Sequence, residues 1–269
     1  MNIHLLKSLL AVPTCTGHEK AMVSFLLEHV SEDPRKRGRV MRDEHNNVFI
    51  VKGQPAEGGY YPCVAAHTDT VFPLSHVNIV RRNSDFIGLN KQGQQRGIGG
   101  DCKTGIHVCL ELLETFDVLK VALFASEENG CRGAFAAHSS FFDDVGYCIE
   151  FDCPSYGVMS YTCGGERLFE NNGPFIRTAL SVLQSCNINR WQHHPFTDVM
   201  ALRKRFEFSC LNLGSGYYRW HSNDEYVKVD DVRQAVSAGM SLLTALGQRN
   251  YPVQDLSGVS PINVTNLNI

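Results

Sequence analysis

Two short apolar segments, residues 61–66 and 120–125, each run directly into a group of ionisable side chains. The first segment is followed by His67-Thr68-Asp69 and the second by Ser126-Glu127-Glu128. Apolar runs of this length are typical of strands that are buried on both faces of a sheet. Because such a sheet must be covered by other elements, the pattern constrains the chain to a layered fold whose strand ends carry chemical groups.

A glycine-rich segment between the two strands, residues 97–100, leads through Asp101 into a helical pattern. From about 102 to 116 the apolar residues recur at helical spacing, which gives one face suited to packing on a sheet. Taken alone, Gly-Gly-Asp is ordinary turn chemistry, and Asp101 could simply cap the helix. In open α/β sheets, however, ligands bind beyond the carboxyl ends of the strands. Two strand ends and one helix start therefore direct ionisable side chains to one place.

The rest of the chain continues the alternation of strands and helices. Strand patterns are present at 77–81, 85–88, 145–151, 156–162 and 206–211, with a hairpin at 39–51, and helical patterns at 3–12, 18–31, 131–138, 173–186, 198–204 and 230–247. This alternation predicts a three-layer α/β/α sandwich, in which a mixed, mostly parallel sheet has helices on both faces. We find no repeat or linker and expect one domain over residues 1–269, with partial disorder in 252–269.

Composition argues against several classes of function. The formal net charge is only −3 and no basic run is longer than Arg35-Lys36-Arg37, so we expect no nucleic-acid or membrane partner. No apolar run approaches the roughly 18–20 residues of a transmembrane helix, and residues 1–13 lack a signal-peptide pattern. We therefore expect a cytoplasmic protein. Its 10 cysteines are scattered without a Cys-x-x-Cys pair, which favours reduced core residues over disulfides or a four-cysteine zinc site.

The candidate functional residues favour metal chemistry. They follow strand-like segments, apart from Asp101 at its helix start: His67, Asp69, Asp101, Glu127, Glu128, Asp152 and His221. A serine hydrolase would show Gly-x-Ser-x-Gly, and Gly214-Ser215-Gly216 lacks that frame. A dinucleotide site would show Gly-x-Gly-x-x-Gly, which residues 97–101 do not fit. Two histidines with several carboxylates instead suit Zn²⁺, Mn²⁺ or Co²⁺.

Each candidate also has an ordinary structural explanation when it is considered alone. His67 could be a core histidine, Asp152 a helix cap, and Glu127 with Glu128 a solvated acidic pair. The order and spacing of the whole set favour the functional interpretation. In a paired-metal site, one carboxylate can bridge ions about 3.5–4 Å apart and leave a water between them to be activated.

Several motifs, in this order, resemble the zinc-dependent exopeptidases related to peptidase T, carboxypeptidase G and the aminopeptidases of the same clan. The matching segments are His67-Thr68-Asp69-Thr70-Val71, residues 99–105, Ser126-Glu127-Glu128 and His221-Ser222, and residues 9–19 resemble the first two helices of these enzymes. The resemblance extends from the first helix to about residue 232. It implies a phosphorylase/hydrolase-like catalytic domain.

The resemblance also implies a set of metal ligands. Asp101 would bridge two divalent metal ions, His67 and Asp152 would complete one site, and Glu128 and His221 would complete the other. The ions would be zinc, with manganese or cobalt as alternatives. The remaining histidines match no ligand position, although the His193-His194 pair could line the site.

Two further roles and one backbone feature follow from the same resemblance. Asp69 would orient His67 through a carboxylate-histidine-metal arrangement. Glu127 would be the general base that takes a proton from the water and passes it to the leaving amine. The peptide bond between Asp101 and Cys102 is expected to be cis.

Substrate recognition is less specific in the sequence. Two-domain relatives carry a lid or dimerisation domain after the position of Asp152, but here only residues 153–220 separate Asp152 from His221, and the core needs them. We therefore expect no lid, no lid-mediated dimer and an open cleft. Tyr218 and Arg219 are candidates for holding a peptide backbone or carboxylate.

Three functions remain open on this basis. The first is a two-metal exopeptidase, either an aminopeptidase or a di- or tripeptidase acting on short peptides. The second is an N-acyl amino-acid deacylase that uses the same site. The third is a non-catalytic binding protein that keeps the fold, which predicts loss of a ligand or of the base; none is lost here.

Overall fold

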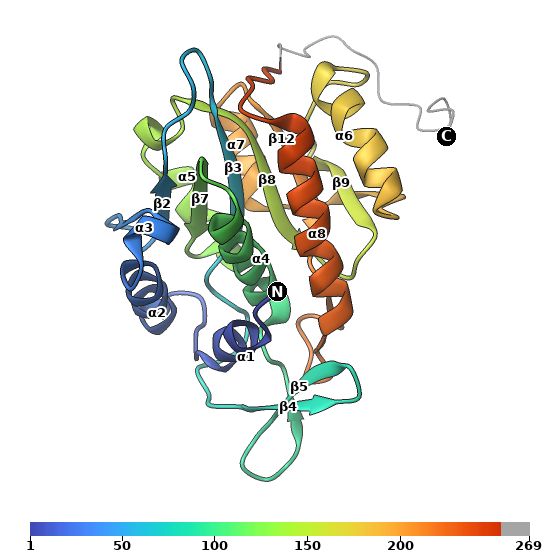
Figure 1. Cartoon of the computed structure of the whole chain (residues 1–269). Helices are drawn as coiled ribbons and strands as arrows, with labels where there is room; N and C mark the ends of the chain where they lie inside the picture. The colour runs from blue at the N-terminus through green and yellow to red at the C-terminus, as the bar shows by residue number, and fades with distance from the viewer. Residues whose placement is uncertain (254–269) are drawn as a thin grey trace.

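A nine-stranded mixed sheet forms the centre of the computed structural model, which describes residues 1–253 (Figure 1). The strands lie in the order β1-β2-β7-β3-β8-β12-β9-β10, and β11 also pairs with β9. Its four central strands are mutually parallel: β7 (Leu119–Phe124), β3 (Tyr61–His67), β8 (Val145–Cys153) and β12 (Ser209–Gly214). All four are buried along their whole length, as parallel strands covered on both faces must be. Their carboxyl ends meet at one edge of the sheet.

The flanks of the sheet are largely antiparallel. On one side the predicted hairpin is confirmed, with β1 (Arg39–Arg42) paired to β2 (Val48–Lys52) and β2 paired to β7. On the other side β9 (Val158–Cys163) runs antiparallel to β12 and to the short β10 (Glu166–Arg167). The strand β11 (Arg190–His194), which the sequence pattern did not predict, pairs in parallel with β9.

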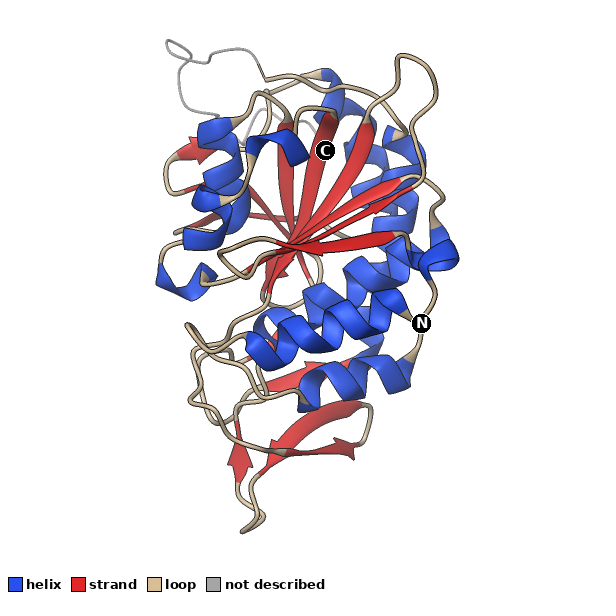
Figure 2. Ribbon diagram, turned by 90° about the vertical axis from the view of Figure 1, so that its left-hand side faces the viewer, coloured by secondary structure: helices blue, strands red, loops and turns tan. Residues whose placement is uncertain are grey.

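Helices cover both faces of the sheet, which confirms the predicted α/β class (Figure 2). On the face turned to the viewer in Figure 1 lie α1 (Ile3–Ala11), α4 (Gly100–Thr115), α6 (Pro174–Ser185) and α8 (Val229–Leu246). Behind the sheet lie α5 (Arg132–Ala136) and α7 (Asp198–Arg205). Near the β1 edge, α2 (Lys20–Ser31) packs on β1 and β2, and α3 (Pro34–Arg37) packs on α2 and α4.

A second sheet of five strands lies beyond one end of α4 and α8, at the bottom of Figures 1 and 2. It consists of β4 (Asn78–Arg82), β5 (Asp85–Leu89), β6 (Gln95–Arg96), β13 (Tyr217–Tyr218) and β14 (Tyr226–Lys228). Because β14 pairs with β5, the segment that precedes α4 lies beside the loop that follows β12. This pairing brings two distant parts of the sequence to the same edge of the central sheet.

The structure bears on three further expectations, which concern the cysteines, membrane-spanning helices and disorder near residue 252. All 10 cysteines are free, and all but Cys15 and Cys186 are buried, as expected of reduced core residues. Within residues 1–253, no helix combines the length and apolar character needed to cross a membrane. The predicted disorder covered residues 252–269, but Pro252 forms a bridge with Phe208 and Val253 is buried. The remainder of that segment, 254–269, lies outside the described residues.

Candidate metal centre

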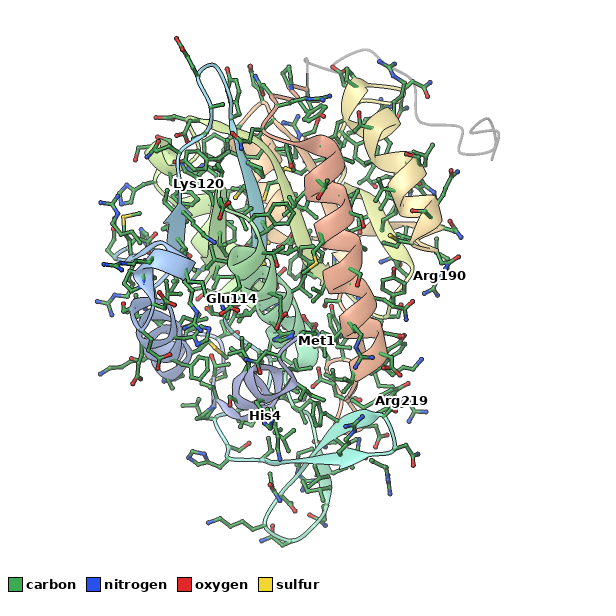
Figure 3. The ribbon with its side chains drawn as sticks, viewed as in Figure 1. Met1, His4, Glu114, Lys120, Arg190 and Arg219 are labelled. Atoms are coloured by element: carbon green, nitrogen blue, oxygen red, sulfur yellow. The ribbon has the colours of Figure 1, made fainter. Side chains whose placement is uncertain are left out.

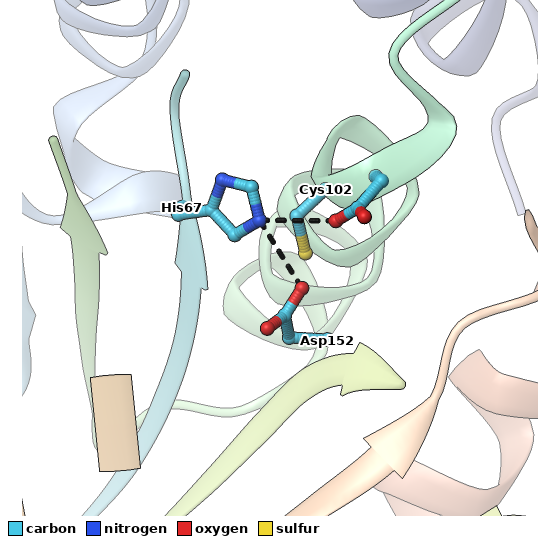
Figure 4. A group of neighbouring side chains, drawn as sticks. His67, Cys102 and Asp152 are labelled. Carbon is cyan, nitrogen blue, oxygen red and sulfur yellow. Dashed lines mark hydrogen bonds and ion pairs between the residues drawn. The ribbon is translucent and has the colours of Figure 1, made fainter. Parts of the chain in front are cut away.

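A first group of candidate ligands surrounds the imidazole of His67 at the carboxyl end of β3. Its Nε2 atom lies 3.1 Å from Oδ1 of Asp101, at the start of α4, and 3.1 Å from Oδ1 of Asp152, near the end of β8 (Figure 4). All three residues are buried. The ends of β3 and β8 and the start of α4 therefore meet here.

A second group lies against the other oxygen of Asp101. Nε2 of His221 is 3.3 Å from Oδ2 of Asp101 and 3.2 Å from Oε1 of Glu128. Glu128 lies in the 3₁₀ turn after β7, and His221 lies in the loop after β12. Asp101 thus presents one oxygen to each group.

The spacing of these atoms fits metal coordination. A tetrahedral zinc ion with bonds of about 2.0–2.1 Å holds its ligand atoms about 3.3–3.4 Å apart. The four separations described above, 3.1 to 3.3 Å, are close to that edge length. The mixture of imidazole nitrogens and carboxylate oxygens also suits zinc and similar divalent ions. The first group, which is buried, and the second, in which His221 is exposed, could therefore hold metal ions, with Asp101 shared between two positions.

Cys102 also belongs to the first group. The sequence interpretation did not include this residue. Its thiol donates a hydrogen bond to the carbonyl of Phe151, with a separation of 3.0 Å. Burial raises the pKa of this thiol well above its usual range, which favours its neutral form. The peptide bond between Asp101 and Cys102 is cis, as expected.

Asp69 holds the surroundings of His67 in two ways. Nδ1 of His67 donates to the backbone carbonyl of Asp69 at 3.1 Å and lies 3.4 Å from its carboxylate. The carboxylate also accepts the backbone N–H groups of Glu127 at 3.0 Å and Glu128 at 3.3 Å. A protonated Nδ1 leaves the lone pair of Nε2 free to face Asp101 and Asp152. Asp69 therefore fixes both the ring of His67 and the turn that carries the acidic pair.

Glu127 points toward the first group but stands slightly apart from it. Its Oε2 atom lies 3.9 Å from Nε2 of His67, and its side chain is buried. Burial raises the pKa of the Glu127 carboxyl well above its usual range. The two adjacent glutamates therefore differ in their contacts. Glu128 lies 3.2 Å from Nε2 of His221, whereas Glu127 lies 3.9 Å from Nε2 of His67.

A buried carboxylate that the sequence interpretation missed, Glu225, holds the loop before α4. Its Oε2 atom accepts the N–H groups of Ile98 and Gly99, each at 2.8 Å, and its Oε1 atom accepts the N–H group of Asp101 at 3.2 Å. Burial and the negative charge of Asp101 raise the pKa of Glu225 to about 7, although the backbone donors oppose this. The second sheet places Glu225 here, because β14 begins at the next residue.

The first group rests on a further layer of buried polar residues. The hydroxyl of Thr197 lies 2.9 Å from Oδ2 of Asp152 and 2.5 Å from Oε2 of Glu150. The backbone N–H of Asp152 donates to Oδ1 of Asn212 at 2.9 Å. Thr197 therefore holds the carboxylate oxygen of Asp152 that does not face His67, and Asn212 holds its backbone.

A cavity of about 370 Å³ opens beside the two groups. Its lining combines residues of the candidate metal centre with residues 192–196, at the end of β11 and directly after it, and with the segment after β12: Asp101, Glu127, Glu128, Asp152, Pro154, Gln192, His193, His194, Pro195, Phe196, Tyr217, Trp220 and His221. The His193-His194 pair therefore does line the site. The volume of the cavity is near the lower end of the range of small-molecule sites.

The two residues proposed from sequence for substrate binding are not part of this lining. The hydroxyl of Tyr218 donates to Asp231, and its ring stacks on Tyr226. The side chain of Arg219 is 69 % exposed and lies 4.0 Å from Asp224, at the surface beside the second sheet (Figure 3). Trp220 and residues 192–196 line the cavity and are therefore better candidates for contact with a substrate.

Comparison with known proteins supports the fold but gives no match in sequence. No family model matches the chain, and no curated protein sequence matches it significantly. Solved structures do match. The aminopeptidase PepT from Bacillus cereus is 11 % identical, with a TM-score of 0.75 over 91 % of this chain and 97 % of that one. A tripeptidase from Staphylococcus aureus is 12 % identical, with a TM-score of 0.72 over 89 % of this chain and 96 % of that one.

A structure described as an endoglucanase from Thermotoga maritima is similar as well. It is 11 % identical, with a TM-score of 0.62 over 90 % of this chain and 97 % of that one. The chain thus shares the fold of peptidases over about nine tenths of its length. Because proteins with different descriptions share this fold, the reaction must be argued from the site.

Proposed function

We propose that the chain is a two-metal hydrolase of amide bonds that removes a terminal residue from short peptides. The observation that carries this proposal is the position of Asp101, whose two carboxylate oxygens face two separate histidine-carboxylate groups. His67 and Asp152 would hold one divalent ion, Glu128 and His221 the other, and Asp101 would contact both. Zinc suits this donor set, with manganese or cobalt as alternatives.

The chain's own residues supply the remaining parts of such a site. A pair of divalent cations, when bound, would polarise the scissile carbonyl and lower the pKa of a water molecule. Glu127 is buried beside the first group, so it can take a proton from water and deliver it to the leaving nitrogen. Asp69 holds the turn of Glu127 by accepting its backbone N–H. The base is thus positioned by a hydrogen bond rather than by packing alone.

The same geometry argues against hydrolysis of glycosides. Glycosidases use a pair of carboxyl groups as acid and as base or nucleophile. Here Asp101, Asp152 and Glu128 each lie within 3.3 Å of a histidine nitrogen, an arrangement of metal ligands rather than of an acid-base pair. An N-acyl amino-acid deacylase would use this site equally well, and it is the second candidate.

The test combines metal analysis with a substrate screen. We expect close to two equivalents of divalent metal per chain after gentle purification, and turnover of dipeptides or tripeptides in preference to N-acetyl amino acids. Faster turnover of N-acetyl amino acids would favour the deacylase. A protein that binds metal and turns over neither class would favour the non-catalytic alternative.

Two variants separate the roles of base and ligand. Glu127→Gln should lower kcat by about 10²- to 10⁴-fold while the metal content stays unchanged, because a general base contributes that much. His221→Ala should lose one equivalent of metal. Full activity in Glu127→Gln would place the base elsewhere, and unchanged metal content in His221→Ala would remove His221 from the ligand set.

A further inference from the structure

Two large aromatic side chains are exposed in the wall of the cavity beside the candidate metal centre. Phe196 is 37 % exposed and Trp220 is 48 % exposed, and both belong to the cavity lining. Exposed apolar surface costs about 25 cal/mol per Å² relative to buried surface. Apolar surface next to a few convergent polar groups is the usual composition of a ligand site.

The backbone around Trp220 is held in a defined turn. The hydroxyl of Ser222 donates to the carbonyl of Arg219 at 2.6 Å and closes the turn. Arg219 and His221, on either side of Trp220, have φ values of 54° and 56°, a region that residues other than glycine rarely adopt. Because His221 is also a candidate metal ligand, the indole is tied to the metal centre by one peptide unit.

Phe196 is tied to the centre from a different segment. It precedes Thr197, whose hydroxyl contacts Asp152 at 2.9 Å. Its own carbonyl accepts a hydrogen bond from Nδ1 of His194 at 2.8 Å. The two aromatic side chains therefore come from separate parts of the chain. Trp220 adjoins the candidate ligand His221, and Phe196 adjoins Thr197, which contacts the candidate ligand Asp152.

The charge of the cavity discriminates between the two ends of a peptide. Among the described residues of its lining, none is lysine or arginine, and four are carboxylates. Two divalent cations would only cancel the formal charge of those carboxylates, which leaves no surplus positive charge for a free α-carboxylate. A free α-ammonium group does not need a cationic partner, so the lack of surplus positive charge does not disfavour it. The lining therefore favours the amino-terminal end of a peptide.

We propose that Phe196 and Trp220 form the subsite for the side chain of the amino-terminal residue of a peptide, and that this subsite selects an uncharged, apolar side chain. This inference rests on the proposed hydrolase function. It goes further by naming the end of the substrate, the class of side chain and the two residues that select it. The small cavity volume of about 370 Å³ suits one terminal residue and the scissile bond.

Hydrolysis of tripeptides of the form X-Gly-Gly by the metal-loaded protein tests the selection. The expected order places Leu and Phe at X above Gly, and Gly above Asp. Trp220→Ala and Phe196→Ala should each lower kcat/KM at least tenfold for Leu-Gly-Gly and less than threefold for Gly-Gly-Gly, since apolar pocket contacts change rates by about 10- to 200-fold. Phe135→Ala is the matched control, because Phe135 is 42 % exposed but lies outside the lining.

A fluorescence measurement tests the subsite by binding alone, in the Glu127→Gln background, because L-leucinamide is itself an amide that the parent enzyme would hydrolyse. The chain has 2 tryptophans, Trp191 and Trp220, so Trp191→Phe leaves Trp220 as the only indole. In that variant, loaded with zinc, L-leucinamide should change the emission in a saturable way, whereas glycinamide and N-acetyl-L-leucine should change it at least tenfold less at equal concentration.

The two measurements separate failure of the subsite from failure of the proposed function. Saturable binding of L-leucinamide without hydrolysis of any tripeptide would support the subsite and overturn the hydrolase. Hydrolysis at equal rates for all X, with no response of Trp220, would overturn the subsite and leave the hydrolase standing. Tighter binding of N-acetyl-L-leucine than of L-leucinamide would overturn the assignment of the amino-terminal end.

Discussion

Single residues behind the ligands set the geometry of this site as strongly as the ligands do. Glu225 is fully buried and accepts three backbone N–H groups from the loop that ends in Asp101. Hydrogen bonds to a charged acceptor are roughly twice as strong as neutral ones. Gly100 allows this approach, because a Cβ at that position would lie 3.2 Å from Oε1 of Glu225 and 2.8 Å from Tyr217. Since Asp101 faces both ligand groups, Glu225 helps to fix the position of a residue that both groups share.

Glu225→Gln should therefore weaken metal binding without unfolding the protein. The single acceptor oxygen of glutamine can keep Ile98 and Gly99, but its NH₂ group then faces the N–H of Asp101, donor against donor. We expect an affinity loss of about 10- to 100-fold, the usual effect of removing a group that orients a ligand. A competition titration with a zinc indicator measures it. Glu166→Gln, at a half-exposed carboxylate near Lys204, is the control; equal affinities in both variants would contradict this role.

His107 should make the protein sensitive to acid. It is buried in α4, and neither ring nitrogen has a hydrogen-bond partner among the described residues. Burial lowers its pKa from 6.5 to about 3. Because the folded-state pKa is below the unfolded one, the unfolded chain takes up the proton first as pH falls. The stabilising contribution of the neutral ring is complete above pH 6.5 and is lost progressively between about pH 6.5 and 3.

His107→Phe should remove this part of the acid sensitivity. Between pH 7.5 and pH 5 we expect the free energy of unfolding of the parent protein to fall by about 2 kcal/mol through His107. Urea titrations at the two pH values measure this loss in the parent, in His107→Phe and in the control His45→Phe, which replaces an exposed histidine. An identical loss in all three proteins would show that His107 does not cause it.

At the scale of elements, Lys103 joins α1 to the start of α4. Its ammonium group donates to the carbonyls of Leu10 at 3.2 Å, Val12 at 2.8 Å and Ile98 at 3.2 Å. Burial lowers its pKa to about 8. The carbonyls of Leu10 and Val12 end the first helix, and the carbonyl of Ile98 belongs to the loop that Glu225 holds from its N–H side. One buried cation thus fixes a helix end and the metal-centre loop together.

Lys103→Met should loosen α1 from the rest of the molecule. The substitution keeps the apolar stem but leaves three carbonyls without this donor, at a cost of about 2–4 kcal/mol in the free energy of unfolding. Amide hydrogen exchange should rise in α1 and in residues 98–101 before it rises in the sheet. Lys7→Met, at an exposed position of α1, provides the control. Unchanged exchange in α1 would show that its apolar face alone holds it.

Sequence patterns predicted the elements that carry their own periodicity. The strands β3 and β7 and the helix α4 could be placed because apolar residues define them. The pairing of β3 with β7 and the start of α4 bring His67, Asp101 and Glu128 together. The strand predicted at 206–211 lies instead at Ser209–Gly214, since the apolar run continues past its expected end. The polar strand β11 and the three-residue β14 gave no signal, because pairing with neighbours rather than composition determines such strands.

The residues that surround the ligands could not be predicted for a related reason. Glu225 and Thr197 resemble any polar loop residue until the fold shows what they contact. Phe196 and Trp220 can be identified as candidate substrate contacts only once the cavity that they line is known. The sequence instead indicated Tyr218 and Arg219, because they lie in the glycine-containing loop 214–219 and can hold a peptide backbone or a carboxylate. Their role in substrate binding stays a prediction without support from the cavity lining.

At the scale of the whole molecule, the site lies at one edge of the sheet, and its walls come from the end of β11, from β13 and from short loops. The cavity is lined by residues 192–196, Pro154, Tyr217 and Trp220 in addition to the candidate metal centre. The expectation that no lid closes over it stays a prediction. If it holds, water exclusion and binding must come from these few residues close to the scissile bond.

Recognition should then be confined to the terminal residue and its immediate neighbours. Binding energy gathered within a cavity of about 370 Å³ cannot depend on residues that lie beyond it. Lengthening Leu-Gly-Gly to Leu-Gly-Gly-Gly-Gly should change kcat/KM by less than about tenfold, which corresponds to roughly 1.4 kcal/mol of transition-state stabilisation. Steady-state rates for the two peptides, with the metal-loaded protein, measure this directly. A steep preference for the longer peptide would reveal a recognition surface outside the cavity, on a second subunit or on another part of the chain.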